Sequence, residues 1–207
     1  MAEIVIAFEY IHSRNIIFRD LKPENVLIDS FGHIKITDFG FAKKLKKEGK
    51  TYTTCGTPEC LAPEVILGLG QDKAVDYWAL GILMYELLNG NTPFHADTYK
   101  ETYQKILKSS VEFPKKISKE AKDLLQQLLE KDPKSRIGCL KNGINDIKNH
   151  KWFKNIKWDQ IQNRNVKSPF IIEIDDESDT KYFGQYKDSF DKPIKLTKEE
   201  LDLFKDF

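Results

Sequence analysis

Apolar residues near the start of the chain recur at the spacing of a helix. Ile4, Phe8 and Ile11 fall close to one face, which predicts an amphipathic helix across residues 2–13. No Ser, Thr, Asp or Asn precedes this segment to cap its first turn. We therefore expect that this helix is cut and that its natural beginning lies upstream of Met1.

The next segment alternates between short apolar runs and polar turns. The runs 26–28 and 34–36 flank Asp29-Ser30-Phe31-Gly32, a pattern typical of a small β-hairpin. Another short apolar run covers residues 16–18. Residues 41–61 are polar and rich in Lys, Thr and Gly, so we expect an exposed loop there.

The segment 74–88 is apolar on nearly all sides, which predicts a helix buried in a core. Asp72 or Asp76 is a candidate for its beginning, and Asn89-Gly90 is typical of its end. Surface helices are expected at 97–108 and 118–130, and more helix at 144–162. The pattern as a whole predicts a mainly helical protein with a short strand section and no internal repeat.

Composition narrows the class of protein. The 33 Lys and Arg residues against 32 Asp and Glu residues give a net charge of +1, which argues against a charge-driven nucleic-acid binder. Hydrophobic residues make up 40% of the chain, enough for a core. The length of 207 residues suggests one domain, or one domain and a small appendage. No apolar stretch approaches the length that spans a bilayer. Three cysteines indicate reduced thiols, and thus a cytoplasmic or nuclear location.

Three short motifs carry the candidate chemistry. They are Arg19-Asp20-Leu21-Lys22-Pro23-Glu24-Asn25, then Asp38-Phe39-Gly40, then Ala62-Pro63-Glu64. In this order and at these gaps they resemble the catalytic loop, the magnesium loop and the end of the activation segment of protein kinases. Alone, Asp20 would be interpreted as a turn residue and Asp38 as the end of a hairpin.

The resemblance implies a role for each polar side chain of these motifs. Asp20 would accept or orient the proton of the substrate hydroxyl, and Lys22 would place a cation at the transferred phosphoryl group, a lysine typical of Ser/Thr specificity. Asn25 and Asp38 would bind Mg²⁺, and ATP would be the phosphoryl donor. Thr57 matches the threonine that contacts the catalytic Asp and Lys. The reaction that these roles imply is phosphorylation of Ser or Thr in proteins.

Two longer stretches narrow the resemblance to one group of kinases. Residues 51–64 resemble the cyclic-nucleotide-dependent and related kinases that share a C-terminal tail. Residues 140–153 are similar to the catalytic subunit of cyclic-AMP-dependent protein kinase, of the AGC group. The resemblance implies that Thr53 is the activation-loop phosphorylation site, with Arg19 and Lys43 contacting its phosphate. A phosphate adds about −1.5 to −2 charges.

The same resemblance assigns peptide-binding and structural residues. Basic residues before the phosphoacceptor would meet acidic positions, each of which also fits an ordinary surface glutamate: Glu24, Glu59 and Glu86. The pocket for the residue that follows the phosphoacceptor would be lined by Thr54, Pro58 and Leu61, with Cys60 standing where related kinases carry tyrosine. Glu64 and Arg136 would form a buried ion pair. Asp76 would hold the backbone of the catalytic loop, although a helix N-cap has the same sequence signal.

The expected fold is a mainly α (α+β) protein-kinase-like C-terminal lobe with a short β-hairpin section and an extended tail. We expect the large lobe at 1–165, truncated at its N-terminus, and an AGC-kinase tail at 166–207. In the tail, Phe183 and Tyr186 match aromatic residues beside the nucleotide, and Phe204 and Phe207 match residues that insert into the small lobe. No G-x-G-x-x-G motif occurs, so we expect the small lobe to be absent.

Three interpretations of function follow. The first is an ATP-dependent Ser/Thr kinase of the cyclic-AMP-dependent type, weak or inactive as this isolated chain because half of the nucleotide site is absent. The second is a non-catalytic module that binds a regulatory subunit or a pseudosubstrate peptide. The third is an incomplete gene model. The expected partners are basic peptides and a separate cyclic-nucleotide-binding subunit, with neither nucleic acid nor a membrane.

Overall fold

The computed structural model describes residues 1–207 except 47–48, 177, 185–195, 204 and 206–207. The chain divides into two units, Met1–Glu173 and Ile174–Phe207. The α-helices of the first unit are α1 Ala2–His12, α2 Pro63–Ile66, α3 Ala74–Asn89, α4 Tyr99–Lys108, α5 Lys119–Leu128, α6 Ile144–Lys148 and α7 Trp158–Gln162. The described residues also form short 3-10 helices: η1 Pro23–Asn25, η2 Pro58–Cys60 and η3 Lys151–Phe153.

In the part of the chain that the structure describes, two small antiparallel sheets accompany these helices. Strands β2 (Val26–Ile28) and β3 (Ile34–Ile36) form the predicted hairpin, with Leu27 opposite Lys35. Strands β1 (Ile16–Ile17) and β4 (Lys43–Lys44) form the second pair. The expectation of a plain exposed loop over 41–61 is therefore wrong, since β4 and η2 lie within it and Leu61 is buried.

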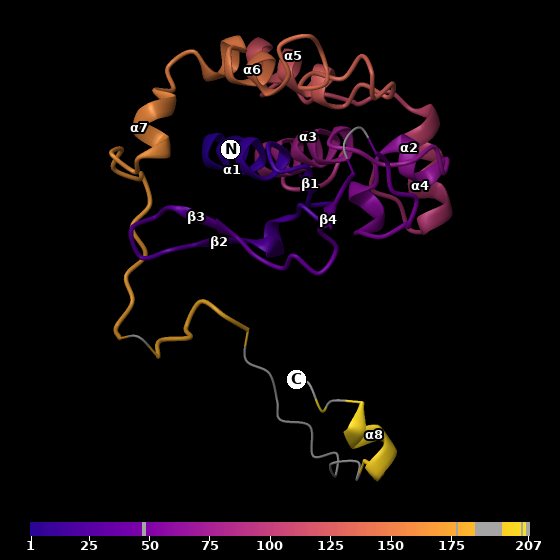
Figure 1. The fold of residues 1–207 in the computed structure, drawn as a ribbon. Helices are drawn as coiled ribbons and strands as arrows, with labels where there is room; N and C mark the ends of the chain where they lie inside the picture. The colour runs from indigo at the N-terminus through magenta and orange to yellow at the C-terminus, as the bar shows by residue number, and fades with distance from the viewer. Residues whose placement is uncertain (47–48, 177, 185–195, 204, 206–207) are drawn as a thin grey trace. The chain divides into compact units, whose positions relative to one another are not determined.

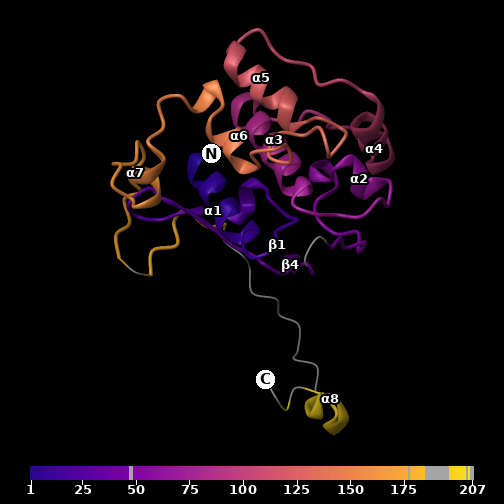
Figure 2. The same cartoon turned by 45° about the horizontal axis from the view of Figure 1, so that its top comes forward.

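Helix α3 forms the centre of the hydrophobic core. Its first twelve residues, Ala74 through Tyr85, are all buried, which confirms the predicted core helix. Both ribbon views place α3 among the other helices of its unit, with α5 alongside (Figures 1 and 2). The helix ends at Gly90, whose φ of 88° is the left-handed geometry that glycine adopts readily. A buried central helix gives the loops on its surface a rigid support.

The structure corrects one sequence expectation about helices and decides between Asp72 and Asp76 in another. The single helical region at 144–162 is broken into α6, η3 and α7, and Trp152, Phe153 and Trp158 pack at the breaks. Asp76 does not begin α3, because the backbone N–H of Ala74 donates to Asp72 Oδ1 at 2.9 Å instead. The Asp76 carboxylate is thereby free to contact a different part of the chain.

The second unit contains helix α8 (Lys198–Asp202), which begins with a capping box formed by Thr197 and Glu200. No helix in the described part of the chain is both long and apolar enough to cross a membrane.

Candidate active site

Asp20 is the centre of a group of polar side chains that come from two segments, residues 20–25 and Thr57. The residue is 2% exposed, and its carboxylate is contacted on both oxygens. Its Oδ1 accepts hydrogen bonds from the backbone N–H of Thr57 at 3.1 Å and from the Thr57 hydroxyl at 2.9 Å. Its Oδ2 accepts one from Asn25 Nδ2 at 3.0 Å and lies 3.1 Å from Lys22 Nζ. Several donors therefore fix the orientation of this carboxylate.

Lys22 contacts both Asp20 and Thr57. Its ammonium also donates to Thr57 Oγ1 at 3.2 Å, so Asp20, Lys22 and Thr57 form a closed triangle of contacts. Burial acts to lower the pKa of Lys22, but the hydrogen bond and charge of Asp20, together with Glu24, raise it overall. Lys22 therefore presents a full positive charge beside the carboxylate.

Gly56 allows the activation segment to approach the catalytic loop this closely. Its φ is +107°, and a Cβ added there would lie 2.7 Å from the carbonyl oxygen of Arg19. A side chain would push the two segments apart, and with them Thr57 and Asp20, which are 37 residues apart in sequence.

The β2–β3 hairpin brings Asn25 and Asp38 to the same end of the site. The backbone N–H of Thr37 donates to the carbonyl of Asn25 at 3.0 Å, directly beyond the paired strands. The amide nitrogen of Asn25 is engaged with Asp20, which leaves its amide oxygen as the group available to a cation. Asp38 is exposed and has a φ of 60°, and one carboxylate oxygen accepts from Gly40 N at 3.1 Å.

The amide oxygen of Asn25 and the carboxylate of Asp38 fit a magnesium ion that keeps most of its water and phosphate ligands. Mg²⁺ prefers hard oxygen ligands and is commonly held by one or two protein groups plus substrate phosphates. No cluster of three or more His, Cys, Asp or Glu side chains with metal-binding geometry occurs among the described residues. The donor set therefore suits a metal that arrives with a nucleotide rather than one enclosed by protein.

Asp76 anchors the backbone of the catalytic loop. Its fully buried carboxylate accepts hydrogen bonds from the backbone N–H groups of Phe18 and Arg19, at 2.9 and 2.8 Å. Arg19 has a φ of 72°, a backbone geometry that is unfavourable for residues other than glycine. The hydrogen bonds to Asp76 stabilise the backbone of Arg19 in this geometry. His12 was not identified from the sequence, yet its Nε2 lies 2.7 Å from Asp76 Oδ2. No local signal identifies a contact between positions 64 residues apart.

Arg19 also reaches the activation segment. Its guanidinium donates to the carbonyl of Phe41 at 2.7 Å and to that of Thr53 at 3.2 Å. Gln71, which the sequence did not single out, donates to the same Thr53 carbonyl at 2.9 Å. The Thr53 side chain is exposed, and Lys43 is exposed on β4 opposite Ile17. Thr53 is thus accessible and lies beside a cation.

The three predicted substrate-binding glutamates gather near one another. Burial first, and then the charges of Glu24 and Glu59, raise the pKa of Glu86. Burial also acts to raise the pKa of Glu59, but hydrogen bonds from Thr92 and His95 lower it overall. The arrangement is an acidic surface, defined here as Glu24, Glu59 and Glu86, that is suited to a cationic partner.

The remaining residues of the predicted peptide pocket differ in accessibility. Thr54 is exposed, Pro58 is half-buried at the start of η2, and Leu61 is only 6% exposed. Burial, followed by the charges of Glu86 and other nearby acids, raises the pKa of the Cys60 thiol to about 12. Cys60 is therefore a neutral packing group rather than a nucleophile.

Glu64 and Arg136 form a bidentate ion pair inside the core. The guanidinium nitrogens lie 2.7 and 3.0 Å from the two carboxylate oxygens, and the Arg136 side chain is 0% exposed. The same guanidinium donates to the carbonyls of Ala74, Glu130 and Lys131. The pair joins α2, at the end of the activation segment, to the start of α3 and the turn after α5.

The tail residues assigned by resemblance are only partly described. Phe183 belongs to the second unit and is 61% exposed. Tyr186, Phe204 and Phe207 lie outside the described residues.

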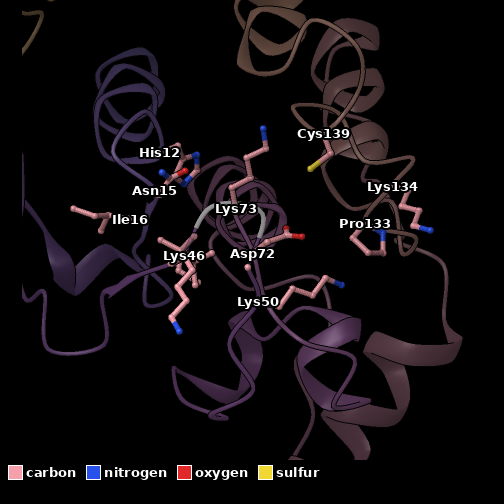
Figure 3. Close-up of a pocket in the computed structure, with 13 residues that line it drawn as sticks. His12, Asn15, Ile16, Lys46, Lys50, Asp72, Lys73, Pro133, Lys134 and Cys139 are labelled. Carbon is pink, nitrogen blue, oxygen red and sulfur yellow. The ribbon is translucent and has the colours of Figure 1, made fainter.

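A hollow of about 560 Å³ is lined on one side by His12, the partner of Asp76. Figure 3 shows that its walls come from the end of α1, with His12 and Asn15, from the start of α3, with Lys73, and from Pro133 and Lys134. None of the predicted catalytic or magnesium-binding residues lines it. Its size alone therefore does not make it the reaction site.

The arrangement around Asp20 is the one that the resemblance to protein kinases predicts, and comparison with known proteins shows the family. The chain belongs to the protein kinase family: residues 1–153 match the family described as "Protein kinase domain". Members of that family transfer a phosphoryl group from ATP with the help of Mg²⁺.

Within this family the chain is similar to the catalytic parts of cyclic-nucleotide-dependent kinases. It is 47% identical over 207 residues to "cAMP-dependent protein kinase catalytic subunit PRKX" of Homo sapiens, covering 100% of this chain and 57% of that protein. It is 51% identical over 185 residues to "cAMP-dependent protein kinase catalytic subunit" of Dictyostelium discoideum, covering 89% of this chain and 28% of that protein. It is also 48% identical over 188 residues to "cGMP-dependent protein kinase 2" of Homo sapiens, covering 90% and 25%.

Proposed function

We propose that the chain supplies the large lobe, residues 1–165, and the tail, 166–207, of an ATP-dependent Ser/Thr protein kinase. The observation that carries this proposal is the arrangement of Lys22, Asn25 and Thr57 around the buried carboxylate of Asp20. Phosphoryl transfer depends on positioning and charge neutralisation more than on covalent chemistry, and this group supplies both.

In the proposed reaction, the Asp20 carboxylate orients the hydroxyl of a substrate Ser or Thr and accepts its proton. The hydroxyl oxygen forms a bond to the γ-phosphorus of ATP, the bond from that phosphorus to the bridging oxygen breaks, and ADP leaves. Lys22 neutralises negative charge on the transferred group, and Thr57 keeps both side chains in position. Mg²⁺ bound by Asn25 and Asp38 would neutralise and orient the phosphates.

The acidic surface would select substrates with basic residues before the phosphoacceptor, and Thr54, Pro58 and Leu61 would contact the residue after it. Phosphorylation of Thr53 would place a dianion beside Arg19, which already contacts the Thr53 carbonyl, with Lys43 as the second cation. Because Arg19 precedes Asp20, this contact would tie the phosphate to the catalytic loop.

The isolated 207 residues are expected to be weakly active or inactive. They contain no glycine-rich G-x-G-x-x-G motif, and they span 57% of the length of the human relative. Phe183 and Tyr186 would act beside the nucleotide only when the rest of that site is present. We propose a cytoplasmic or nuclear protein that binds basic peptides and a separate regulatory subunit.

A second function, binding without catalysis, is favoured by one observation. The acidic surface is formed wholly within this chain, so capture of a pseudosubstrate peptide or a regulatory subunit does not require nucleotide.

A chimaera provides the decisive experiment. The small lobe of the human relative, which contains its glycine-rich loop, would be fused ahead of Met1. Transfer of labelled phosphate from ATP to an arginine-containing serine peptide would be measured. We expect the chimaera to be active and the unfused chain to be nearly inactive. Asp20→Asn in the chimaera should lower the rate by about 10²- to 10⁴-fold, the usual contribution of a positioned acid–base group.

Two results would contradict the proposal. A folded chimaera that binds peptide without transferring phosphate would leave only the binding function. Robust phosphorylation by the unfused chain, lost in Asp38→Ala, would show that the expected weakness of the 207 residues is wrong.

A further inference from the structure

The three glutamates of the acidic surface are not equivalent. Both carboxylate oxygens of Glu59 are occupied within the chain: the Thr92 hydroxyl donates to Oε2, and His95 Nδ1 lies 2.9 Å from Oε1. Glu24 and Glu86 have no hydrogen-bond or ion-pair partner through their carboxylates among the described residues. The carboxylates of Glu24 and Glu86 are therefore available to a cation, whereas Glu59 already accepts from donors on both oxygens.

The loop that carries Thr92 and His95 is held firmly against η2. Between them, Phe94 is 1% exposed and stacks on Trp78 of α3, with ring centroids 5.8 Å apart and an angle of 5°. On the far side, Lys105 Nζ of α4 donates to the carbonyl oxygen of His95 at 2.6 Å. Because a buried ring and a lysine fix the backbone, the two donors are directed at Glu59 by the fold.

The two donors differ in how easily a ligand would displace them. The His95 side chain is 63% exposed, whereas Thr92 is half-buried. A carboxylate accepts only, so Nδ1 of His95 is the donor in this contact. A basic peptide side chain that approaches Glu59 must therefore displace the imidazole or share the carboxylate with it.

We propose that His95 determines the substrate specificity of this acidic surface by occupying the carboxylate of Glu59. Glu24 and Glu86 then receive the basic residues of the peptide, and a further basic residue directed at Glu59 adds little affinity. This inference rests on the proposed peptide-binding role of the acidic surface. His95 acts here as a positioning residue for Glu59 and takes no part in phosphoryl transfer.

The test uses binding of fluorescent peptides to the full 207-residue chain, measured by anisotropy. One peptide carries two arginines before the serine. A set of peptides adds a third arginine, moved one position at a time toward the N-terminus. In the wild-type chain we expect the third arginine to change affinity little at any position.

Removal of the imidazole should make the Glu59 carboxylate available to the third arginine of the peptide. His95→Ala should tighten binding of one or two of the three-arginine peptides by about twofold to fivefold, the range for an exposed ion pair, and leave the two-arginine peptide unchanged. His95→Asn, whose amide nitrogen replaces Nδ1 as a donor, should behave like the wild type. Adding Glu59→Gln to His95→Ala should abolish the gain.

Failure of the inference and failure of the proposed function give different results. If the two-arginine peptide binds and Glu86→Gln weakens it, but His95→Ala leaves every peptide unchanged, the specificity role of His95 is wrong. A gain that persists in the Glu59→Gln background also overturns it. If no basic peptide binds the wild-type chain, the peptide-binding function itself fails and this inference fails with it.

Discussion

The buried ion pair between Glu64 and Arg136 provides the sharpest test of how this lobe is held together. Glu64→Ala would leave the guanidinium of Arg136 buried with only carbonyl partners. Arg136→Ala would leave a buried carboxylate and would also remove the donors of those carbonyls. Each single change therefore strands a charge or polar groups that water cannot reach.

The expected magnitudes follow from this geometry. Breaking a buried pair by removing one partner costs about 3–5 kcal/mol. Arg136→Ala should lie at the upper end, because the guanidinium is 0% exposed and donates to carbonyls as well as to Glu64. The double variant strands no charge, so its loss should be smaller than the sum of the single losses by about 2 kcal/mol or more.

Urea unfolding followed by circular dichroism gives the free energy of unfolding for the wild type, both single variants and the double variant. Lys148 and Glu9 offer a matched control, because their ion pair is 3.0 Å long but partly exposed. Glu9→Ala should cost no more than about 1 kcal/mol. If a single alanine variant does not fold, Glu64→Gln provides a milder change for the same cycle.

Additive losses would refute this reasoning. If the double variant loses the sum of the single losses to within about 0.5 kcal/mol, the two side chains do not stabilise each other. A loss in Glu9→Ala as large as that in Glu64→Ala would show that burial is not the cause.

Three further predictions concern the site. Gly56→Ala should lower peptide phosphorylation by the chimaera at least tenfold, since its Cβ would meet the catalytic-loop backbone at 2.7 Å, and an unchanged rate would contradict this. Asp76→Ala should lower the free energy of unfolding by at least about 3 kcal/mol, because it leaves two backbone N–H groups without their acceptor. Asp72→Ala, which removes one helix-cap bond, should cost about 1 kcal/mol, and equal losses would refute the distinction. Burial and the charges of Glu24 and Glu59 raise the pKa of Glu86 above its ordinary value of 4.5, so its charge is lost at a higher pH than that of an ordinary glutamate. Affinity for a basic peptide should therefore fall at a pH above 4.5, and Glu86→Gln should flatten that fall.

The regular elements could mostly be predicted because their signals are local. The helix expected at 2–13 is confirmed as α1, the hairpin has the predicted strands, and Gly90 ends α3 as expected. The expected surface helices at 97–108 and 118–130 are confirmed as α4 and α5. Apolar periodicity and turn residues act over a few positions, so they can be read without knowledge of the rest of the chain.

The errors fall where packing overrides the local pattern. The aromatic residues in 144–162 predicted one helical region, but the indole and phenyl rings pack on one another at breaks between short helices. Leu61 belongs to a polar stretch, yet it is 6% exposed. The burial of Leu61 depends on core residues that are distant in sequence, and the local pattern of residues 41–61 does not indicate them.

The sequence alone determined the kinase family and the short-range half of the site, because Asp20, Lys22 and Asn25 lie within six consecutive positions. Only the tertiary structure decided which distant groups complete it. It showed that Asp76 binds the backbone of the catalytic loop instead of capping a helix, and that His12 contacts the Asp76 carboxylate. It also showed that Nδ1 of His95 contacts the carboxylate of Glu59. These partners lie 36 to 64 residues apart in sequence, and their meeting depends on how α1, α3 and the loops pack around one core.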